Sequence, residues 1–291
     1  MSGKSVMRLV VALTTVAIAL IVWWSDSFVA EKPMEPTYRS DRLFKPYGDA
    51  VYSIAQKIER GQAISVSELK ALPDGVNSRY GEEITLLFHA LGARNVEAID
   101  KLLEAGADPY MIDRPSTGSE RDFVYYLGMY GHPTDRKKGL PFINQLISLY
   151  LKHGGDPNRR FHGPDETPLI TDLALTKNYE GINLLLEAGA DPWAENDQEE
   201  NAMTRLASDM VSQMALNQLI DHGYFNNVPI KKIKNFMQSL SGYLPRGDEI
   251  SLANQAIGRR VLKRYPQYID DEDTKRLFQG PIPWQEILNE Q

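Results

Sequence analysis

The chain of 291 residues contains no cysteine and only five histidines. The absence of cysteine excludes disulfides, thiolate metal sites and cysteine nucleophiles. The histidines show no metal-ligand spacing such as His-Glu-x-x-His; they are His89, His132, His153, His162 and His222. We therefore expect no metal site and no cofactor.

The sequence also lacks the motifs of common catalytic and phosphate-binding sites. There is no Gly-x-Ser-x-Gly elbow, and the glycine pair in "GMYGHP" at 128–133 lacks the lysine of a phosphate-binding loop. Basic residues are outnumbered, 32 against 39 acidic ones, and the formal net charge is −7. A dense basic patch is the footprint of nucleic-acid binding, and none is present. We expect no enzyme activity, no small-molecule substrate and no nucleic-acid partner.

One long apolar run is present, "MRLVVALTTVAIALIVWW" at residues 7–24. As a helix it would be roughly 27 Å long, close to the hydrocarbon thickness of a bilayer. Lys4 and Arg8 precede the apolar stretch, and Asp26 and Glu31 follow it. This charge pattern predicts a transmembrane signal anchor with residues 1–6 as a cytoplasmic tail.

A cleaved signal peptide is the alternative interpretation, because Ser25 and Ser27 are small residues suited to a cleavage site. Either interpretation exports the rest of the chain. We expect a single-pass protein of a bacterial inner membrane with its C-terminal body in the periplasm. Residues 25–48 contain Pro33, Pro36 and Pro46 without apolar periodicity, which predicts an extended linker.

The octapeptide "LLEAGADP" occurs at 102–109 and again at 185–192. Weaker copies are "LKHGGDP" at 151–157 and "LIDHGYF" at 219–225, and the copies share Gly106, Gly154, Gly189 and Gly223. Two of the three intervals between these glycines are close to the ~33-residue period of ankyrin repeats. We expect each glycine to end a leucine-rich helix in a left-handed conformation, which glycine adopts without steric cost.

The segment "TPLITDLAL" from Thr167, together with small residues at Ala90, Ala174 and Ala207, completes a pattern that resembles the ankyrin-repeat family. The resemblance implies an all-α ankyrin-repeat solenoid of about four repeats across residues 75–227. The second repeat departs from the pattern through an insertion near 128–139, which we expect to be a loop. Residues 49–74 and 228–291 show helical periodicity and are expected to form helical caps.

In ankyrin-like stacks the hairpin tips that follow the glycine motif project from the binding face. The candidate protein-binding residues at those tips are of types that often dominate interfaces: Tyr110, Met111, Arg114, Arg159, Arg160, Phe161, Trp193 and Glu195. Tyr110 and Trp193 have an alternative role, packing between adjacent hairpins, because aromatic rings bury as readily as they bind.

A signal anchor followed by "GADP" repeats resembles exported immunity proteins that neutralise antibacterial effectors delivered by type VI secretion, notably lipases. The resemblance implies a non-catalytic, membrane-tethered module whose partner is another protein. The alternative is an envelope scaffold or stress-protection protein that binds the cell's own membrane proteins.

Overall fold

The computed structural model describes residues 39–112, 121–129, 136–160, 166–209, 212–242, 249–268 and 272–278. This described part is mostly helical and has no β-strand, only isolated bridges such as that between Arg160 and Pro168. The expected all-α class is therefore confirmed.

Most of the helices form pairs of successive helices. The first helices are α3 (Asp49–Glu59), α5 (Leu86–Gly92), α7 (Phe123–Met129), α9 (Leu169–Leu175), α11 (Ala202–Ala207) and α13 (Ile230–Ser241). The second helices are α4 (Val66–Lys70), α6 (Val96–Glu104), α8 (Arg136–Lys152), α10 (Tyr179–Glu187), α12 (Gln213–Asp221) and α14 (Glu249–Arg264). The shorter elements are α2 (Ser40–Leu43), α15 (Glu272–Phe278) and the 3-10 turns η1 (Lys45–Tyr47), η2 (Gly81–Glu83) and η3 (Pro266–Tyr268).

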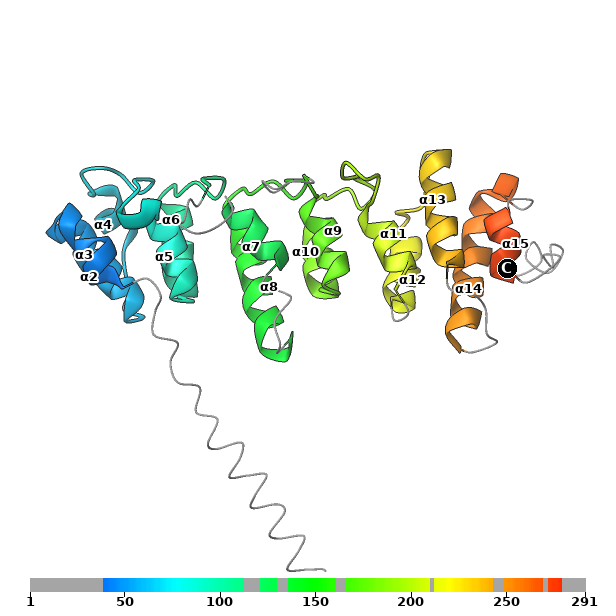
Figure 1. Ribbon diagram of the computed structural model, residues 1–291, viewed down its shortest axis with the longest axis horizontal. Helices are drawn as coiled ribbons and strands as arrows, with labels where there is room; N and C mark the ends of the chain where they lie inside the picture. Colours follow the sequence, from blue (N-terminus) through cyan, green and yellow to red (C-terminus); the bar gives the residue numbers. More distant parts are fainter. Residues whose placement is uncertain are drawn as a thin grey trace, which may run out of the picture.

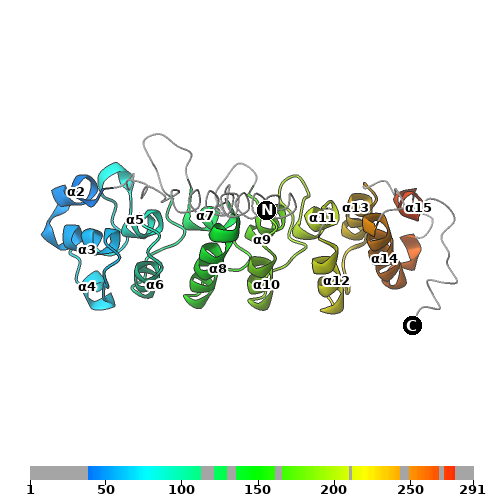
Figure 2. The same ribbon diagram turned by 90° about the horizontal axis from the view of Figure 1, so that it is seen from below.

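The pairs stand side by side in chain order, as Figure 1 shows. In the view from below, α5, α7, α9 and α11 form one layer, and α6, α8, α10 and α12 form the other (Figure 2). The loops between pairs make one long edge, here called the loop rim, around residues 71–84, 105–112, 153–160, 188–201 and 222–229. The turns inside pairs, near residues 61, 94, 177 and 209, make the opposite edge, the turn rim.

The four shared glycines end their helices as the sequence predicts. Gly106, Gly154, Gly189 and Gly223 have φ between 81° and 95°. Each glycine amide donates to the carbonyl three residues back at 3.0–3.1 Å, and the next amide donates five residues back at 2.8–3.1 Å. This is the Schellman pattern, which satisfies carbonyls at the helix end that would otherwise lack a donor. It sets the angle at which each chain segment enters the loop rim.

The turns inside two of the pairs have the same backbone path without glycine. Arg94 and Lys177 take left-handed φ values of 54° and 58°, which cost a residue with a Cβ about 1 kcal/mol. The next residue caps the second helix: Asn95 Oδ1 accepts from the Ala98 amide at 3.0 Å, and Asn178 Oδ1 from the Gly181 amide at 3.1 Å. These asparagines therefore fix where α6 and α10 begin.

A continuous apolar core runs along the row. The small residues expected at close helix contacts, Ala90, Ala174 and Ala207, are all buried. In α5 and α9 every residue before the last is buried, His89 and Asp172 included. The first helices thus form the centre of the fold, and their neighbours on either side supply the burial that one helix pair lacks.

The linker predicted for 25–48 ends earlier than expected. Residues 39–48 form α2 and η1, and Leu43 and Phe44 are buried. The Phe44 ring lies 4.7 Å from the His89 ring. The prediction of an extended linker was wrong here because Pro46 lies in the first turn of η1, where proline is tolerated.

The loop predicted near 128–139 is also corrected. Helix α7 continues through Met129, and α8 begins at Arg136, so only 130–135 lies between the two helices and outside the described residues. The inserted residues lengthen α8 to 17 residues, against nine in α6 and α10. Pro141 lies inside α8, in the part that reaches past its neighbours.

The helix start predicted at Thr167 is shifted by one residue. Pro168 is the N-cap of α9 and has no side-chain cap bond, so the hydroxyl of Thr167 does not cap the helix. The predicted cytoplasmic tail (1–6) and anchor (7–24) lie outside the described residues. Within the described ranges no helix is both long and apolar enough to cross a bilayer.

Candidate functional site

The loop rim carries most of the candidate binding residues, and its backbone is built from one recurring turn. In three of the four copies, the aspartate after the glycine accepts a hydrogen bond from the amide two residues on. The distances are 2.8 Å from Asp108 to Tyr110, 2.8 Å from Asp156 to Asn158 and 2.9 Å from Asp191 to Trp193. Such Asx turns preset the loop conformation, so the rim is organised without a partner.

The residue two positions after each aspartate ties its loop to the next one. Tyr110 Oη accepts from the Asp156 amide at 2.9 Å. Asn158 Oδ1 accepts from the Asp191 amide at 2.7 Å, and its Nδ2 donates to the Gly189 carbonyl at 3.2 Å.

Trp193 Nε1 continues the series by donating to the Tyr224 carbonyl at 2.7 Å. At the other end, Asn77 bonds the Gly106 carbonyl at 3.0 Å and the Asp108 amide at 2.8 Å. These side-chain bonds form a ladder along the rim. Two of the residues predicted to contact a partner, Tyr110 and Trp193, are therefore rungs of that ladder.

Tyr110 belongs to a closed hydrogen-bond network. Tyr150 donates its hydroxyl proton to the Asp156 carbonyl at 2.9 Å, so it accepts from the Tyr110 hydroxyl at 3.0 Å. Burial, with the Tyr110 bond as the second cause, raises the pKa of Tyr150 far above its ordinary value. Tyr150 therefore stays protonated and acts as a fixed structural link between Tyr110 and Asp156.

Tyr150 also explains why this loop reads "GGD" where the loops at Gly106 and Gly189 read "GAD". Its carbonyl accepts from Gly155, as the Leu102 carbonyl accepts from Ala107. A Cβ on Gly155 would lie 2.5 Å from Cδ2 of the Tyr150 ring, which is an overlap. The larger ring on the helix requires the smaller residue in the loop.

Trp193 is a core residue. Its exposed fraction is 6%, and its ring centroid lies 5.2 Å from that of Phe225 and 6.0 Å from that of Phe236. Packing between adjacent loops is therefore the role the structure gives it, and its prediction as a partner contact is corrected. Burial against α13 outweighs the interface preference of tryptophan at this position.

Arg159 is partly committed to the fold. Its guanidinium lies 4.6 Å from the centroid of the Tyr110 ring and 3.7 Å from Oδ2 of the fully buried Asp122. About 38% of its side chain remains exposed. Arg159 thus joins the loop 153–160 to the loop 105–112, and part of its side chain remains exposed to solvent.

Arg160 and Met111 are half-buried on the same rim. The Arg160 guanidinium donates through Nη1 to the Glu166 carbonyl at 3.1 Å, at the exposed base of its loop. A guanidinium carries further N–H donors of the kind that pair with a carboxylate or a carbonyl of another protein. Arg114 and Phe161, the other two predicted contacts, lie outside the described residues.

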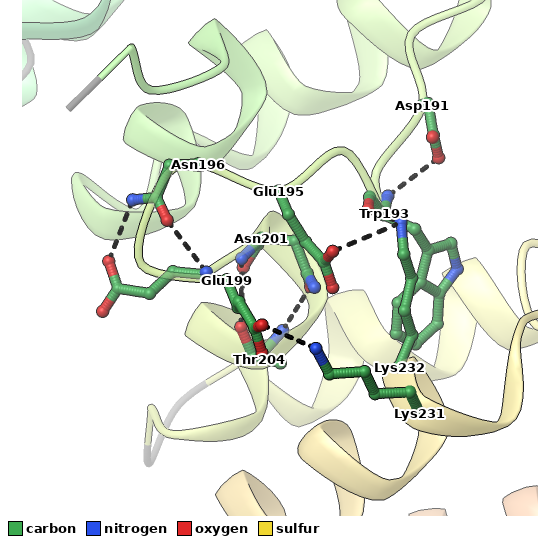
Figure 3. Close-up of polar contacts among 10 residues, drawn as sticks. Asp191, Trp193, Glu195, Asn196, Glu199, Asn201, Thr204, Lys231 and Lys232 are labelled. Atoms are coloured by element: carbon green, nitrogen blue, oxygen red, sulfur yellow. Dashed lines mark hydrogen bonds and ion pairs between the residues drawn. The ribbon is translucent and has the colours of Figure 1, made fainter.

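Glu195 lies in the loop 191–201, which is pinned to α13 (Figure 3). Lys232 lies 4.0 Å from Glu195 and also donates to the Trp193 carbonyl. Lys231 pairs with Glu199 at 2.6 Å, which raises the pKa of the lysine. The loop's own polar side chains complete its shape: Asn196 accepts from the Gln198 and Glu200 amides, and Asn201 forms a capping box with Thr204.

A shallow hollow of about 520 Å³ opens between this loop and the next. Its polar lining includes Asp191, Asn226, Asn227 and Lys232, and Pro192 and Pro229 supply apolar walls. A hollow of this size accepts one or two side chains of a partner. In the part of the chain that the structure describes, no group of three His, Asp or Glu residues is placed to hold a metal ion.

Sequence reasoning missed the ladder residues Asn77 and Asn158 and the pinning residues Lys231 and Lys232. Asn158 has a signal that was available, because it occupies the same place after the motif aspartate as Tyr110 and Trp193. No signal in the sequence identifies Lys231 and Lys232, since their partners lie more than thirty residues away in sequence. No protein-family model matches this chain, and no curated protein sequence matches it.

Proposed function

We propose that this chain is a membrane-tethered ankyrin-repeat protein whose periplasmic body binds another protein through the loop rim. The assignment as an ankyrin-repeat solenoid is supported by the identical closing turns at Gly106, Gly154, Gly189 and Gly223 and by the row of helix pairs. Stacked units of this kind present long surfaces that suit a protein partner. The apolar run at 7–24 supports the tether.

The observation that carries the binding role is the preorganised loop rim. Its loops are joined by side-chain bonds from Asn77 to Tyr224, so little order remains to be imposed when a partner docks. Arg160, Met111 and the open face of Arg159 are the described candidates for contact on this rim. The polar hollow beside Asp191 and Lys232 adds a place for a partner side chain.

A non-catalytic role is consistent with how the titratable groups are used. The pKa shifts among the described residues arise from pairs and burial that serve the fold, as at Glu68 with Lys57 and at Asp100 with Lys152. Catalytic sites instead gather shifted groups in one cleft.

The more specific proposal is an immunity protein that neutralises a secreted, lipase-type antibacterial effector. A tether would hold the inhibitor at the membrane that such an enzyme attacks, which raises its effective concentration there. The test is a toxicity rescue. Cells that lack this chain are challenged with the effectors encoded by genes next to its own. We expect sensitivity to one effector and restoration by the full chain. Equal resistance with and without the chain would refute the immunity role.

The second candidate is an envelope scaffold that binds the cell's own membrane proteins. It shares the exported, tethered body and the organised loop rim. It differs in predicting stable partners in unchallenged cells, recovered by pull-down of the full chain. Recovery of one effector only after challenge favours the immunity role.

A further inference from the structure

The turn rim, opposite the loop rim, carries several exposed apolar side chains. Of the five large apolar side chains that are most exposed in the described part, three lie there. They are Leu175 at the end of α9, Met214 in the first turn of α12 and Leu252 in the first turn of α14, with exposed fractions of 50%, 76% and 59%.

Hydrogen bonds hold the turns that carry these residues next to one another. Lys177, two residues after Leu175, bonds Asp209 at 2.6 Å in the turn before α12. Gln213, beside Met214, donates to Asn254 of α14 at 3.2 Å. The three apolar residues therefore belong to neighbouring parts of one edge.

The described chain also begins at this edge. The amide of Ser40 donates to Glu59, at the end of α3, at 3.1 Å. The carbonyl of Ile58, one residue earlier, accepts from Asn95 in the turn between α5 and α6 at 3.0 Å. The segment that leads to the proposed anchor thus joins the body beside the end of α3, near the turn rim, and α2 leads from there to η2, where Arg42 pairs with Glu82.

The length of that segment limits how far the body can lie from the bilayer. With residues 39–48 folded, only 25–38 separate the apolar run from the body. Fully extended, a segment of this length spans at most roughly 50 Å. Because it attaches near the turn rim, the tether is shortest when that rim, and not the loop rim, faces the membrane.

Charge on the same edge complements an anionic lipid surface. Helix α8 reaches past α5 and α9 at the turn rim (Figure 1). Its first residues are Arg136, Lys137 and Lys138, and its first turn contains no acidic residue. Helix N-termini favour acidic residues, so this sequence is unfavourable for the helix alone. An edge that combines basic and apolar residues is typical of surfaces that contact anionic bilayers.

We propose that the turn rim lies on the outer leaflet of the membrane that holds the anchor, and that it contacts anionic phospholipid headgroups. Leu175, Met214 and Leu252 enter the interface, and the helix end that begins with Arg136 lies at the level of the lipid phosphates. The loop rim then points away from the bilayer, where it is open to a protein partner. This inference rests on the proposed membrane anchor.

The test uses the full chain in proteoliposomes of phosphatidylethanolamine and phosphatidylglycerol. Because the chain has no cysteine, Leu175→Cys, Met214→Cys and Asp197→Cys each give one labelling site. Asp197 is the matched control, exposed on the loop rim. An environment-sensitive fluorophore is attached, and quenching by headgroup-nitroxide lipids is measured. We expect quenching at Cys-labelled positions 175 and 214 and none at 197. Equal quenching at both rims, or none at 175 and 214, overturns the proposal.

The electrostatic part is tested separately in the Met214→Cys background. Arg136→Glu, Lys137→Glu and Lys138→Glu together should abolish the quenching at unchanged thermal stability, and phosphatidylcholine vesicles or high salt should weaken it. Quenching that survives the reversal contradicts the headgroup contact. Flotation after a carbonate wash distinguishes the failures. A chain that leaves the vesicles refutes the anchor itself, whereas a retained chain without quenching refutes only the orientation.

Discussion

The hydroxyl of Tyr110 accepts a hydrogen bond from the backbone amide of Asp156 at 2.9 Å, across the gap between two loops. In the next loop, Asn158 accepts a hydrogen bond from the Asp191 amide in the same way. The rim is therefore held by side chains that reach from one loop to the following backbone, and the stability of the body depends on them.

Removing the Tyr110 hydroxyl should weaken the body. Tyr110→Phe leaves the Asp156 amide and the Tyr150 hydroxyl each without one partner, so we expect a loss of about 1–2 kcal/mol in the free energy of unfolding. Chemical denaturation monitored by circular dichroism measures it. Tyr47→Phe, at an exposed tyrosine, is the control and should leave stability unchanged. Equal midpoints for both variants would contradict the ladder.

Tyr150 and Gly155 should be energetically coupled. Gly155→Ala forces a Cβ into the Tyr150 ring, and overpacking of this kind costs about 1–3 kcal/mol. Tyr150→Leu alone leaves a cavity and breaks the bond to Asp156. The double variant has the leucine and alanine that the equivalent positions carry at Leu102 and Ala107. Its loss of unfolding free energy should therefore be smaller than the sum of the two single losses. Additive losses would mean that the two residues do not share space.

Arg94 separates backbone strain from side-chain contact. Arg94→Ala and Arg94→Gly both remove the guanidinium that lies 4.4 Å from the centroid of the Phe142 ring. Only alanine retains the cost of the left-handed φ, so the glycine variant should be the more stable of the two by about 1 kcal/mol. Thermal melts of the two variants side by side decide it. A more stable alanine variant would contradict the strain at this turn.

His89 should make stability depend on pH. Burial lowers the pKa of His89, while Nε2 donates to the Ala55 carbonyl at 3.0 Å in the neutral form. The unfolded chain takes up a proton near pH 6.5 that the folded chain resists, so stability is full above that pH and falls below it. His89→Gln should flatten the melting temperature between about pH 7 and 5. His222→Gln, at an exposed histidine, is the control and should leave this pH dependence as it is in the wild type. A wild-type pH dependence of the melting temperature in His89→Gln would contradict the role of His89.

The sequence predicted the helix ends better than the roles of the side chains beyond them. Gly106 and its equivalents could be recognised because a left-handed helix end depends on one local residue and its backbone. The ladder could not, because Tyr110 and Asp156 meet only when two units stack. Trp193 shows the same limit: its burial is decided by Phe236, far along the chain. The misplaced loop near 128–139 had a different cause, since extra residues can lengthen a helix as easily as a loop.

The binding role of the loop rim has its most direct test in a calorimetric titration of the effector that the rescue assay identifies. The full chain in nanodiscs is compared with Arg160→Glu on the loop rim and Gln218→Glu at an exposed position of α12, in the layer of second helices. We expect the wild type and Gln218→Glu to bind alike and Arg160→Glu to lose at least about tenfold in affinity, or 1.4 kcal/mol, with all three equally folded. Unchanged binding by Arg160→Glu, with loss at Gln218→Glu, would place the partner on the opposite face and contradict the account.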